Sequence, residues 1–329
     1  MKTCAALLVA LLVLPAGLSS QSKPNLGVPS TTGLVVSSSD IAADIGASIL
    51  AKGGNAVDAA VATAFAMAVT YPFAGNLGGG GFMVVRTPDG KATTFDYRET
   101  APARSTPTMY LGADVNIDIR LTSTGYLAPG VPGTVRGMAL AHKRFGKLPW
   151  RDVIMPAATL AGTGFVMAPS FAASLEREVT NGMKPYATSV AAYGKPGSGV
   201  WAAGDRLVLP DLAKSLTAIA TDGPDVFYKG WIADRIAADM AAHGGLMTKD
   251  DLGAYQAKER APITGTFLGY QVISMGPPSS GGIALVEMLN MLEALQIQRT
   301  TRGSADAVHL VTEVMRRGFL DRARFLGDT

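Results

Sequence analysis

The segment FDYRET, residues 95–100, carries an arginine that could bind a carboxylate. Arg98 follows a predicted strand and lies shortly after the glycine run of NLGGGGFM (76–83). A guanidinium binds a carboxylate through two parallel hydrogen bonds, so Arg98 beside a glycine-lined hollow could hold the carboxylate of a substrate. The alternative, which the residues alone favour, is an ordinary ion pair between Arg98 and Glu99 or Asp96.

Four consecutive glycines precede this segment and raise the question of a phosphate loop. They are Gly78, Gly79, Gly80 and Gly81. A Walker-type loop needs Lys and then Ser or Thr after its last glycine, whereas Phe82 and Met83 follow here. A dinucleotide loop needs a strand before it and a helix after it, and the predicted order is the reverse. We therefore interpret the run as backbone that lets two segments approach closely.

Other residue types that could carry chemistry lack the necessary spacing. The three histidines are His142, His243 and His309, and none has a partner at a metal-ligand spacing, so we expect no metal site. The sequence contains no GxSxG motif, which excludes a hydrolase nucleophile elbow. In PPSSGG (277–282), Ser279 and Ser280 could form an anion-binding turn, but capping of the following helix is the favoured interpretation.

The composition is that of a globular protein with a large core. Hydrophobic residues make up 48% of the 329, charged residues make up 17%, and the formal net charge is +3. Because the basic residues are scattered along the chain, we expect no nucleic-acid partner.

The N-terminal segment has the layout of a secretory signal peptide. In residues 1–20, Lys2 precedes an apolar run, which is followed by Pro15 and small residues. The run is short for a membrane span, so we expect cleavage, export to the periplasm or the medium, and no stable membrane span afterwards. The only cysteine, Cys4, would be lost with the signal. Residues 21–32 are predicted to be a linker, and residues 33–329 the functional region.

The periodicity of the remaining chain predicts a mixture of helices and hairpins. Strands are expected at 33–39 and 266–275, and a hairpin is expected from 82–87 and 91–99. Helices are expected at 41–52, 56–70, 138–145, 150–161, 210–220, 231–242, 248–253, 283–295 and 304–324. Asp40 and Asn55 are expected to cap the first two helices. The order lacks the regular alternation of a doubly wound sheet, so an α+β fold is predicted.

Taken in order, longer motifs resemble those of γ-glutamyltransferases. They are GGNAVDAAVA (53–62), NLGGGGFM (76–83), DYRETAP (96–102), GVPGTVRG (130–137), LAKSL with GPDVFYKG (212–230), GGLMTKDDLGAY (244–255), PPSSGGI (277–283) and DRARFLGD (321–328). The resemblance extends over essentially the whole chain after the predicted signal peptide. It implies the N-terminal-nucleophile hydrolase fold, an αββα sandwich of two stacked sheets between helix layers.

The resemblance also implies a reaction. Such enzymes are precursors that cut themselves into a large and a small subunit, and the new N-terminal threonine becomes the nucleophile, with its own amine as base. It takes the γ-glutamyl group from glutathione or a related amide and passes it to water, an amino acid or a peptide, without a cofactor. Arg98 matches the arginine that grips the donor's α-carboxylate. Glu99 would orient that arginine or the substrate amine, and the four glycines would pack near the pocket.

The resemblance is to the large-subunit portion only. No Thr-[Thr/Ser]-His segment occurs in the sequence, so the nucleophile is expected beyond Thr329, within a small subunit. The chain alone is therefore expected to form an incomplete sandwich and to be inactive. Three alternatives remain open: a glutaryl or cephalosporin acylase, a poly-γ-glutamate-processing enzyme, and a catalytically dead module that binds γ-glutamyl compounds.

Overall fold

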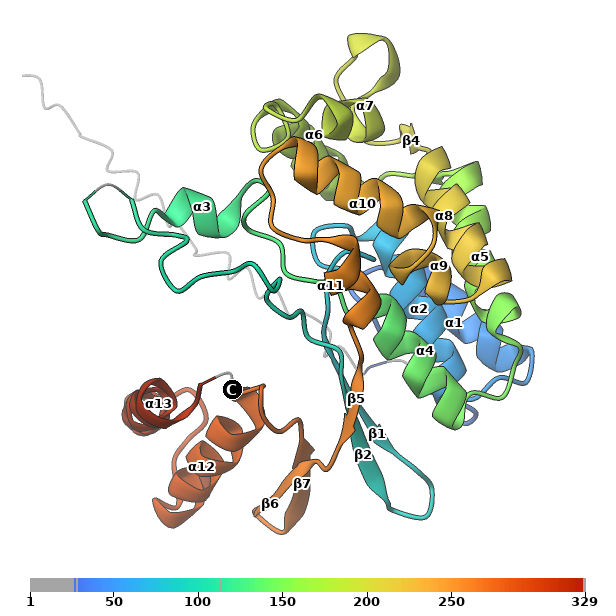
Figure 1. Ribbon diagram of the computed structural model, residues 1–329. Coiled ribbons are helices and arrows are strands. Elements are labelled where there is room, and N and C mark those ends of the chain that lie inside the picture. The colour runs from blue at the N-terminus through green and yellow to red at the C-terminus, as the bar shows by residue number, and fades with distance from the viewer. Residues whose placement is uncertain (1–26, 28, 113, 328–329) are drawn as a thin grey trace, which may run out of the picture. The chain divides into compact units, whose positions relative to one another are not determined.

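The computed structural model describes residues 27, 29–112 and 114–327 (Figure 1). The predicted signal peptide at 1–20, and most of the linker predicted at 21–32, lie outside these residues. The chain divides into two units, Met1–Leu34 and Val35–Thr329.

The first two helices begin at side chains that cap them. Helix α1 (Asp40–Ala51) has its N-cap at Ser39, whose hydroxyl accepts the Ala42 N–H at 3.3 Å. The prediction of Asp40 as the cap is therefore wrong by one residue, because Ser39 has the extended backbone of an N-cap and Asp40 lies in the first turn. Helix α2 (Ala56–Thr70) begins with the capping box predicted in part, in which Asn55 and Asp58 each bind the other's backbone N–H.

No strand forms over residues 33–39, so that prediction is wrong. The hydroxyl of Ser37 instead donates to the carbonyl oxygen of Ser39 at 2.7 Å and accepts its N–H at 3.2 Å. Such local hydrogen bonds by serine offer the backbone an alternative to a strand ladder. The apolar residue Val36 is left 79% exposed.

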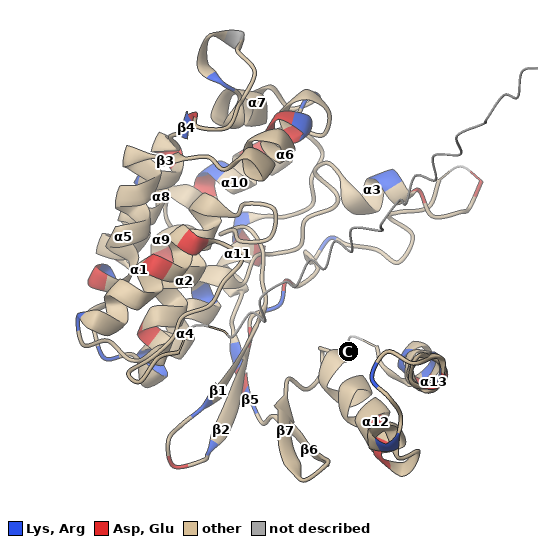
Figure 2. Cartoon of the chain, turned by 180° about the vertical axis from the view of Figure 1, so that it is seen from behind, with Lys and Arg blue, Asp and Glu red and all other residues tan. Residues whose placement is uncertain are grey.

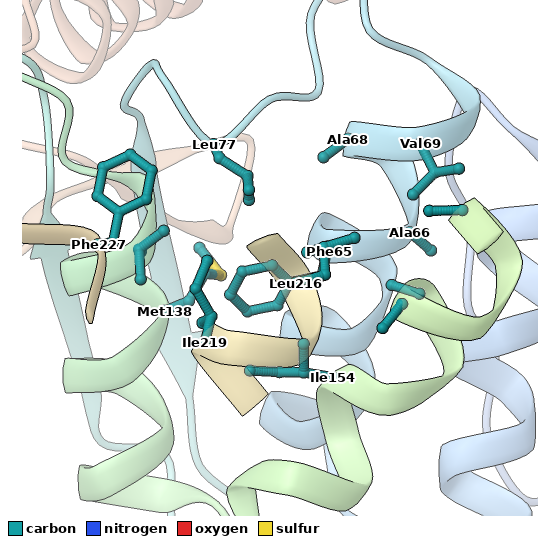
Figure 3. Packing of buried hydrophobic residues seen from close by; sticks show 14 of the residues in the cluster. Phe65, Ala66, Ala68, Val69, Leu77, Met138, Ile154, Leu216, Ile219 and Phe227 are labelled. Atoms are coloured by element: carbon teal, nitrogen blue, oxygen red, sulfur yellow. The ribbon is translucent and has the colours of Figure 1, made fainter. Parts of the chain in front are cut away.

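Four helices surround the centre of the core. They are α2, α4 (Thr134–Phe145), α5 (Trp150–Thr163) and α8 (Pro210–Asp222). Phe65, Ile154 and Ile219 come from α2, α5 and α8, meet in one cluster and are at most 1% exposed (Figure 3). Because α2 is rich in alanine and buried on nearly all sides, its neighbours approach it closely, as its sequence predicts.

The largest sheet carries the candidate site at one end of a strand. Strands β1 (Phe82–Arg86), β2 (Ala92–Asp96) and β5 (Lys258–Arg260) pair antiparallel in the order β1-β2-β5. The β1–β2 hairpin is the one that the PDG turn predicts. A second, two-stranded sheet joins β3 (Phe165–Val166) to β4 (Arg206–Leu207).

The single strand predicted at 266–275 is a hairpin. It consists of β6 (Ile263–Phe267) and β7 (Tyr270–Ser274), which pair antiparallel. Leu268 and Gly269 form its turn with φ of 48° and 83°. Two successive residues with positive φ are what a tight hairpin turn requires, but leucine is an unusual residue there, so the sequence conceals the turn.

The remaining helices lie between these elements and after the last hairpin. They are α3 (Ile119–Ser123), α6 (Pro169–Thr180), α7 (Ala187–Tyr193), α9 (Asp225–Tyr228), α10 (Trp231–Ala242), α11 (Lys249–Ala254), α12 (Gly281–Ala294) and α13 (Ala305–Phe325). The four at α10, α11, α12 and α13 match predicted helices within a few residues. Figure 2 shows charged residues of both signs spread over helices and strands. Within the described part of the chain, no helix is both long and apolar enough to cross a membrane.

Candidate active site

Arg98 lies just beyond the end of β2, with its main chain held on both sides. Its N–H donates to Oδ1 of Asp96 at 3.1 Å. Its carbonyl oxygen accepts the hydroxyl of Tyr255 at 2.7 Å. The side chain itself is exposed. The Arg98 peptide is therefore fixed while its guanidinium remains accessible.

The neighbouring carboxylates do not bind this guanidinium. Asp96 is 7% exposed, and its Oδ2 instead pairs with Nε of Arg260 at 2.8 Å. Among the described residues, no ion pair or hydrogen bond joins the Arg98 guanidinium to Glu99 or to any other side chain. The ion pair that the residues alone favoured is absent from the described residues, and the Asp96 carboxylate pairs with Arg260 instead.

A cavity of about 250 Å³ opens at Arg98. Its lining includes the basic side chains of Arg98, Lys258 and Arg260 and the carboxylates of Asp96 and Glu99. One of the carboxylates, on Asp96, is already paired with Arg260. The other charged groups of the lining, on Arg98, Lys258 and Glu99, leave a net positive charge, which favours a small anion. The exposed guanidinium of Arg98 offers two parallel donors, which match the two oxygens of a carboxylate.

The glycine run lies directly against the Arg98 segment. Gly81 exchanges two backbone hydrogen bonds with Tyr97, at 3.2 and 3.0 Å, and so continues the β1–β2 ladder. A Cβ atom on Gly80 would overlap the carbonyl oxygen of Tyr97 and would lie 2.8 Å from the N atom of Glu99. Glycine is needed at position 80 because these two backbones touch.

The run also supports the start of helix α4. The carbonyl oxygen of Gly79 accepts the N–H groups of Gly133 and Thr134, at 2.7 and 3.0 Å. No side chain caps this helix, so the glycine run supplies the acceptor that its first N–H groups need. By contrast, a Cβ on Gly78 would meet nothing within 4 Å. Three of the four glycines thus have a packing reason, because a Cβ would overlap the Asn76 side chain at Gly79, the Tyr97 main chain at Gly80 and the Tyr97 ring at Gly81.

A cluster of tyrosines supports the site, although no role was predicted for these residues from the sequence. The ring of Tyr255 stacks on that of Tyr228, with centroids 6.0 Å apart and an interplanar angle of 11°. The Tyr228 hydroxyl donates to the carbonyl oxygen of Pro132 at 3.0 Å and accepts the Arg136 N–H at 3.1 Å. Burial raises the pKa of both phenols and raises that of Tyr97 to about 12. In the sequence, these tyrosines could be noticed only as members of the longer motifs.

The other candidate residues lie elsewhere and have structural partners. Nε2 of His142 lies 2.9 Å from the carbonyl oxygen of Leu148, and His243 stacks on Tyr126 at 4.5 Å. His309 lies within α13. Over the described ranges, no three His, Cys, Asp or Glu side chains form a group that could hold a metal ion.

In the PPSSGG turn a serine stabilises the start of α12 as predicted, but the serine is Ser279 and not Ser280. Ser280 is the N-cap of α12, but its side chain makes no capping hydrogen bond. Its hydroxyl instead accepts Nε–H of Arg322 at 2.7 Å. Ser279 accepts the N–H of Gly281 at 3.2 Å, so the preceding serine stabilises the start of the helix.

Comparison with known proteins identifies the same family as the motifs. The family model for gamma-glutamyltranspeptidase matches residues 42–329. The glutathione hydrolase proenzyme of Escherichia coli is 47% identical over 296 residues, which are 90% of this chain and 51% of that protein. The chain therefore spans about half the length of this curated relative.

A solved structure of high similarity is the gamma-glutamyltranspeptidase of Helicobacter pylori. It superimposes with a TM-score of 0.89 at 40% identity, over 92% of this chain and 86% of that one. The acylase ACY 1 proenzyme of a Pseudomonas strain is less similar, at 39% identity over 94% of this chain and 55% of that protein. These likenesses confirm the predicted fold class, the α+β fold of N-terminal-nucleophile hydrolases.

Proposed function

The chain belongs to the γ-glutamyltranspeptidase family, and from that premise we propose that it is the large-subunit region of a glutathione hydrolase proenzyme. Its similarity to half the length of the E. coli glutathione hydrolase proenzyme supports this proposal. The proposed partners are a γ-glutamyl donor such as glutathione and the small subunit of the same precursor.

The proposed role of Arg98 is to bind the α-carboxylate of the γ-glutamyl donor. One observation carries this role: the Arg98 guanidinium is exposed at a cavity and unpaired among the described residues, although two carboxylates lie in the same segment. A bidentate contact with the α-carboxylate would fix the far end of the donor. The scissile γ-amide would then be held in one position relative to the nucleophile.

The proposed nucleophile is the N-terminal threonine of the small subunit. Its amine would take the hydroxyl proton as the oxygen attacks the γ-amide carbonyl. The resulting ammonium would return that proton to the leaving amine as the C–N bond breaks, which leaves the γ-glutamyl group as an ester on the threonine. Water would then release glutamate, or an amino acid or peptide would accept the group. Glu99 lies in the same cavity and is proposed to orient the substrate amine or Arg98.

Kinetics of the complete precursor test the role of Arg98. Replacing Arg98 by Ala should cost about 2–5 kcal/mol of transition-state binding for a γ-glutamyl anilide. Replacing it by Lys should cost less, because lysine keeps the positive charge but lacks the two parallel donors of the guanidinium. The matched control is Arg151→Ala, which removes an exposed arginine on α5. A wild-type kcat/KM for Arg98→Ala would remove Arg98 from the site.

The same assay separates the alternatives. An acylase would release a glutaryl anilide, which lacks the α-amine, faster than the γ-glutamyl anilide. A binding module would retain γ-glutamyl compounds without turnover even when the small-subunit region is supplied. The 329 residues expressed alone should show no turnover, and release of anilide by them would refute the proposed nucleophile.

The predicted signal peptide and linker remain part of the proposal. We propose that residues 1–20 direct export and that residues 21–32 link the mature N-terminus to the region from residue 33. N-terminal sequencing of protein recovered from the periplasm and the medium would check this. A mature protein that retains Met1 in the cytoplasm would contradict it.

A further inference from the structure

The main chain at Arg98 is held by two side chains that come from different parts of the chain. Asp96 accepts the Arg98 N–H at 3.1 Å, and Tyr255 donates its hydroxyl to the Arg98 carbonyl at 2.7 Å. Both hydrogen-bonding groups of this residue are thus satisfied by side chains. Neither contact uses the guanidinium, which keeps its donors for a ligand.

Asp96 is itself fixed. It is the last residue of β2, pairs in register with Lys258 of β5 and is 7% exposed. Its second oxygen accepts Nε–H of Arg260 at 2.8 Å. A buried carboxylate with two charge-assisted or backbone donors has little freedom to rotate, so its hold on the Arg98 N–H is rigid.

Tyr255 is fixed by packing. It is 6% exposed, and its ring lies nearly parallel to that of Tyr228. Gly133 leaves the space for its hydroxyl, because a Cβ at that position would overlap the Tyr255 oxygen. Burial raises the pKa of Tyr255, so the hydroxyl keeps its proton and remains a donor at neutral pH.

We propose that Tyr255 and Asp96 are positioning residues for carboxylate recognition, acting through the main chain of Arg98. The proposal rests on the proposed function of Arg98 as the carboxylate clamp. A fork-shaped contact depends on angle as well as distance, so small shifts of the Arg98 backbone would misdirect the guanidinium. Fixing that backbone lets an exposed arginine bind with the orientation expected of a buried one.

Tyr255→Phe in the complete processed enzyme tests the inference, because it removes only the hydroxyl. We expect KM for a γ-glutamyl anilide to rise about 3- to 10-fold, as for the loss of one hydrogen bond, while kcat changes less than about twofold. The matched control is Tyr110→Phe. It removes a hydroxyl that donates to the carbonyl of Leu127 at 3.0 Å, in a segment that does not line the cavity. Its KM should stay at the wild-type value.

A double-mutant cycle distinguishes positioning from general loss of structure. In an Arg98→Ala background, Tyr255→Phe should change KM by less than about twofold, because the residue through which it acts is gone. Asp96→Asn gives a second variant, and it should likewise raise KM only while Arg98 is present. Thermal unfolding of each variant reports stability separately.

Each outcome has a definite meaning. If Arg98→Ala weakens catalysis but Tyr255→Phe and Asp96→Asn leave KM as Tyr110→Phe does, the positioning role is refuted and the proposed function stands. Equal effects of Tyr255→Phe with and without Arg98 would also refute it. If Arg98→Ala leaves kcat/KM unchanged, the proposed function fails, and the positioning inference fails with it.

Discussion

Gly137 lies in the first turns of α4, where that helix meets the residue before Arg98. A Cβ built on Gly137 would overlap the Cβ, Cγ and Cδ1 atoms of Tyr97, well inside the 3.4–4 Å of ordinary contact. The ring cannot swing away easily, since Tyr97 is 8% exposed and its hydroxyl donates to the carbonyl of Phe82 at 3.1 Å. Gly137→Ala should therefore displace either the helix or the strand end.

The magnitude follows from two opposing effects. Overpacking of a closed core costs about 3 kcal/mol at the upper end of its usual range, which suits an overlap with three atoms of a fixed side chain. Alanine in a helix returns about 1 kcal/mol relative to glycine. The expected net loss is about 2 kcal/mol of the free energy of unfolding, or roughly 3 °C in Tm for a chain of this size.

Urea denaturation followed by circular dichroism measures this loss, and Gly162→Ala provides the control. Gly162 lies in α5, where an added Cβ would come to 3.5 Å from the Ala213 side chain, an ordinary contact. The same substitution should there be neutral or stabilising by about 0.5 kcal/mol. If Gly137→Ala were as stable as the wild type while Gly162→Ala behaved as expected, the close packing of α4 on Tyr97 would be refuted.

Two further substitutions test contacts outside the cavity. Asp58 is fully buried and accepts three backbone N–H groups, two of them from Lys147 and Leu148. Asp58→Ala leaves these donors unpaired, so it should lower the free energy of unfolding, measured by urea titration, by about 3 kcal/mol or more. A loss below about 1 kcal/mol would contradict this account. The hydrogen bond from Arg136, whose Nη1 lies 2.6 Å from Oδ1 of Asp225, lowers the pKa of that carboxyl. Its stabilisation is present above the unfolded pKa and is lost as the pH falls through the folded pKa. Asp225→Asn should therefore lower the urea midpoint at pH 7 and converge on the wild type only at a pH below the folded pKa, which itself lies below the ordinary value of 3.8. An equal difference at both pH values would contradict it.

The sequence predicted those elements that depend on contacts between residues close together in the chain. The capping box at Asn55 and the turn at residues 88–90 involve side chains and backbone within a few positions of one another, and both elements formed where expected. Helix α6 was not predicted, although Pro169 lies at its first position, where proline is typical of a helix start. The hairpin turn at Leu268 was concealed because leucine rarely adopts positive φ.

The candidate site depended on contacts that no local pattern contains. Arg98 was identified from its motif, and its role remains a prediction. Its partners could not be predicted, because the hydroxyl of Tyr255 lies 157 residues further along the chain and the guanidinium that pairs with Asp96 lies 164 residues further. Sequence proximity favoured an ion pair within 96–99, whereas the fold brought Arg260 to the same carboxylate.

The glycines around Tyr97 differ in whether evolution could ever compensate for their loss. At Gly80 and Gly133, a new side chain would collide with the main-chain oxygen of Tyr97, an atom that every amino acid possesses. No replacement at position 97 can remove it, so a suppressor screen should find no side-chain rescue there for either glycine. At Gly137 the obstacle is the side chain of Tyr97, its Cβ included, so glycine at position 97 would make room. A second substitution at position 97 therefore cannot compensate for the loss of Gly80 or Gly133, but it can compensate for the loss of Gly137.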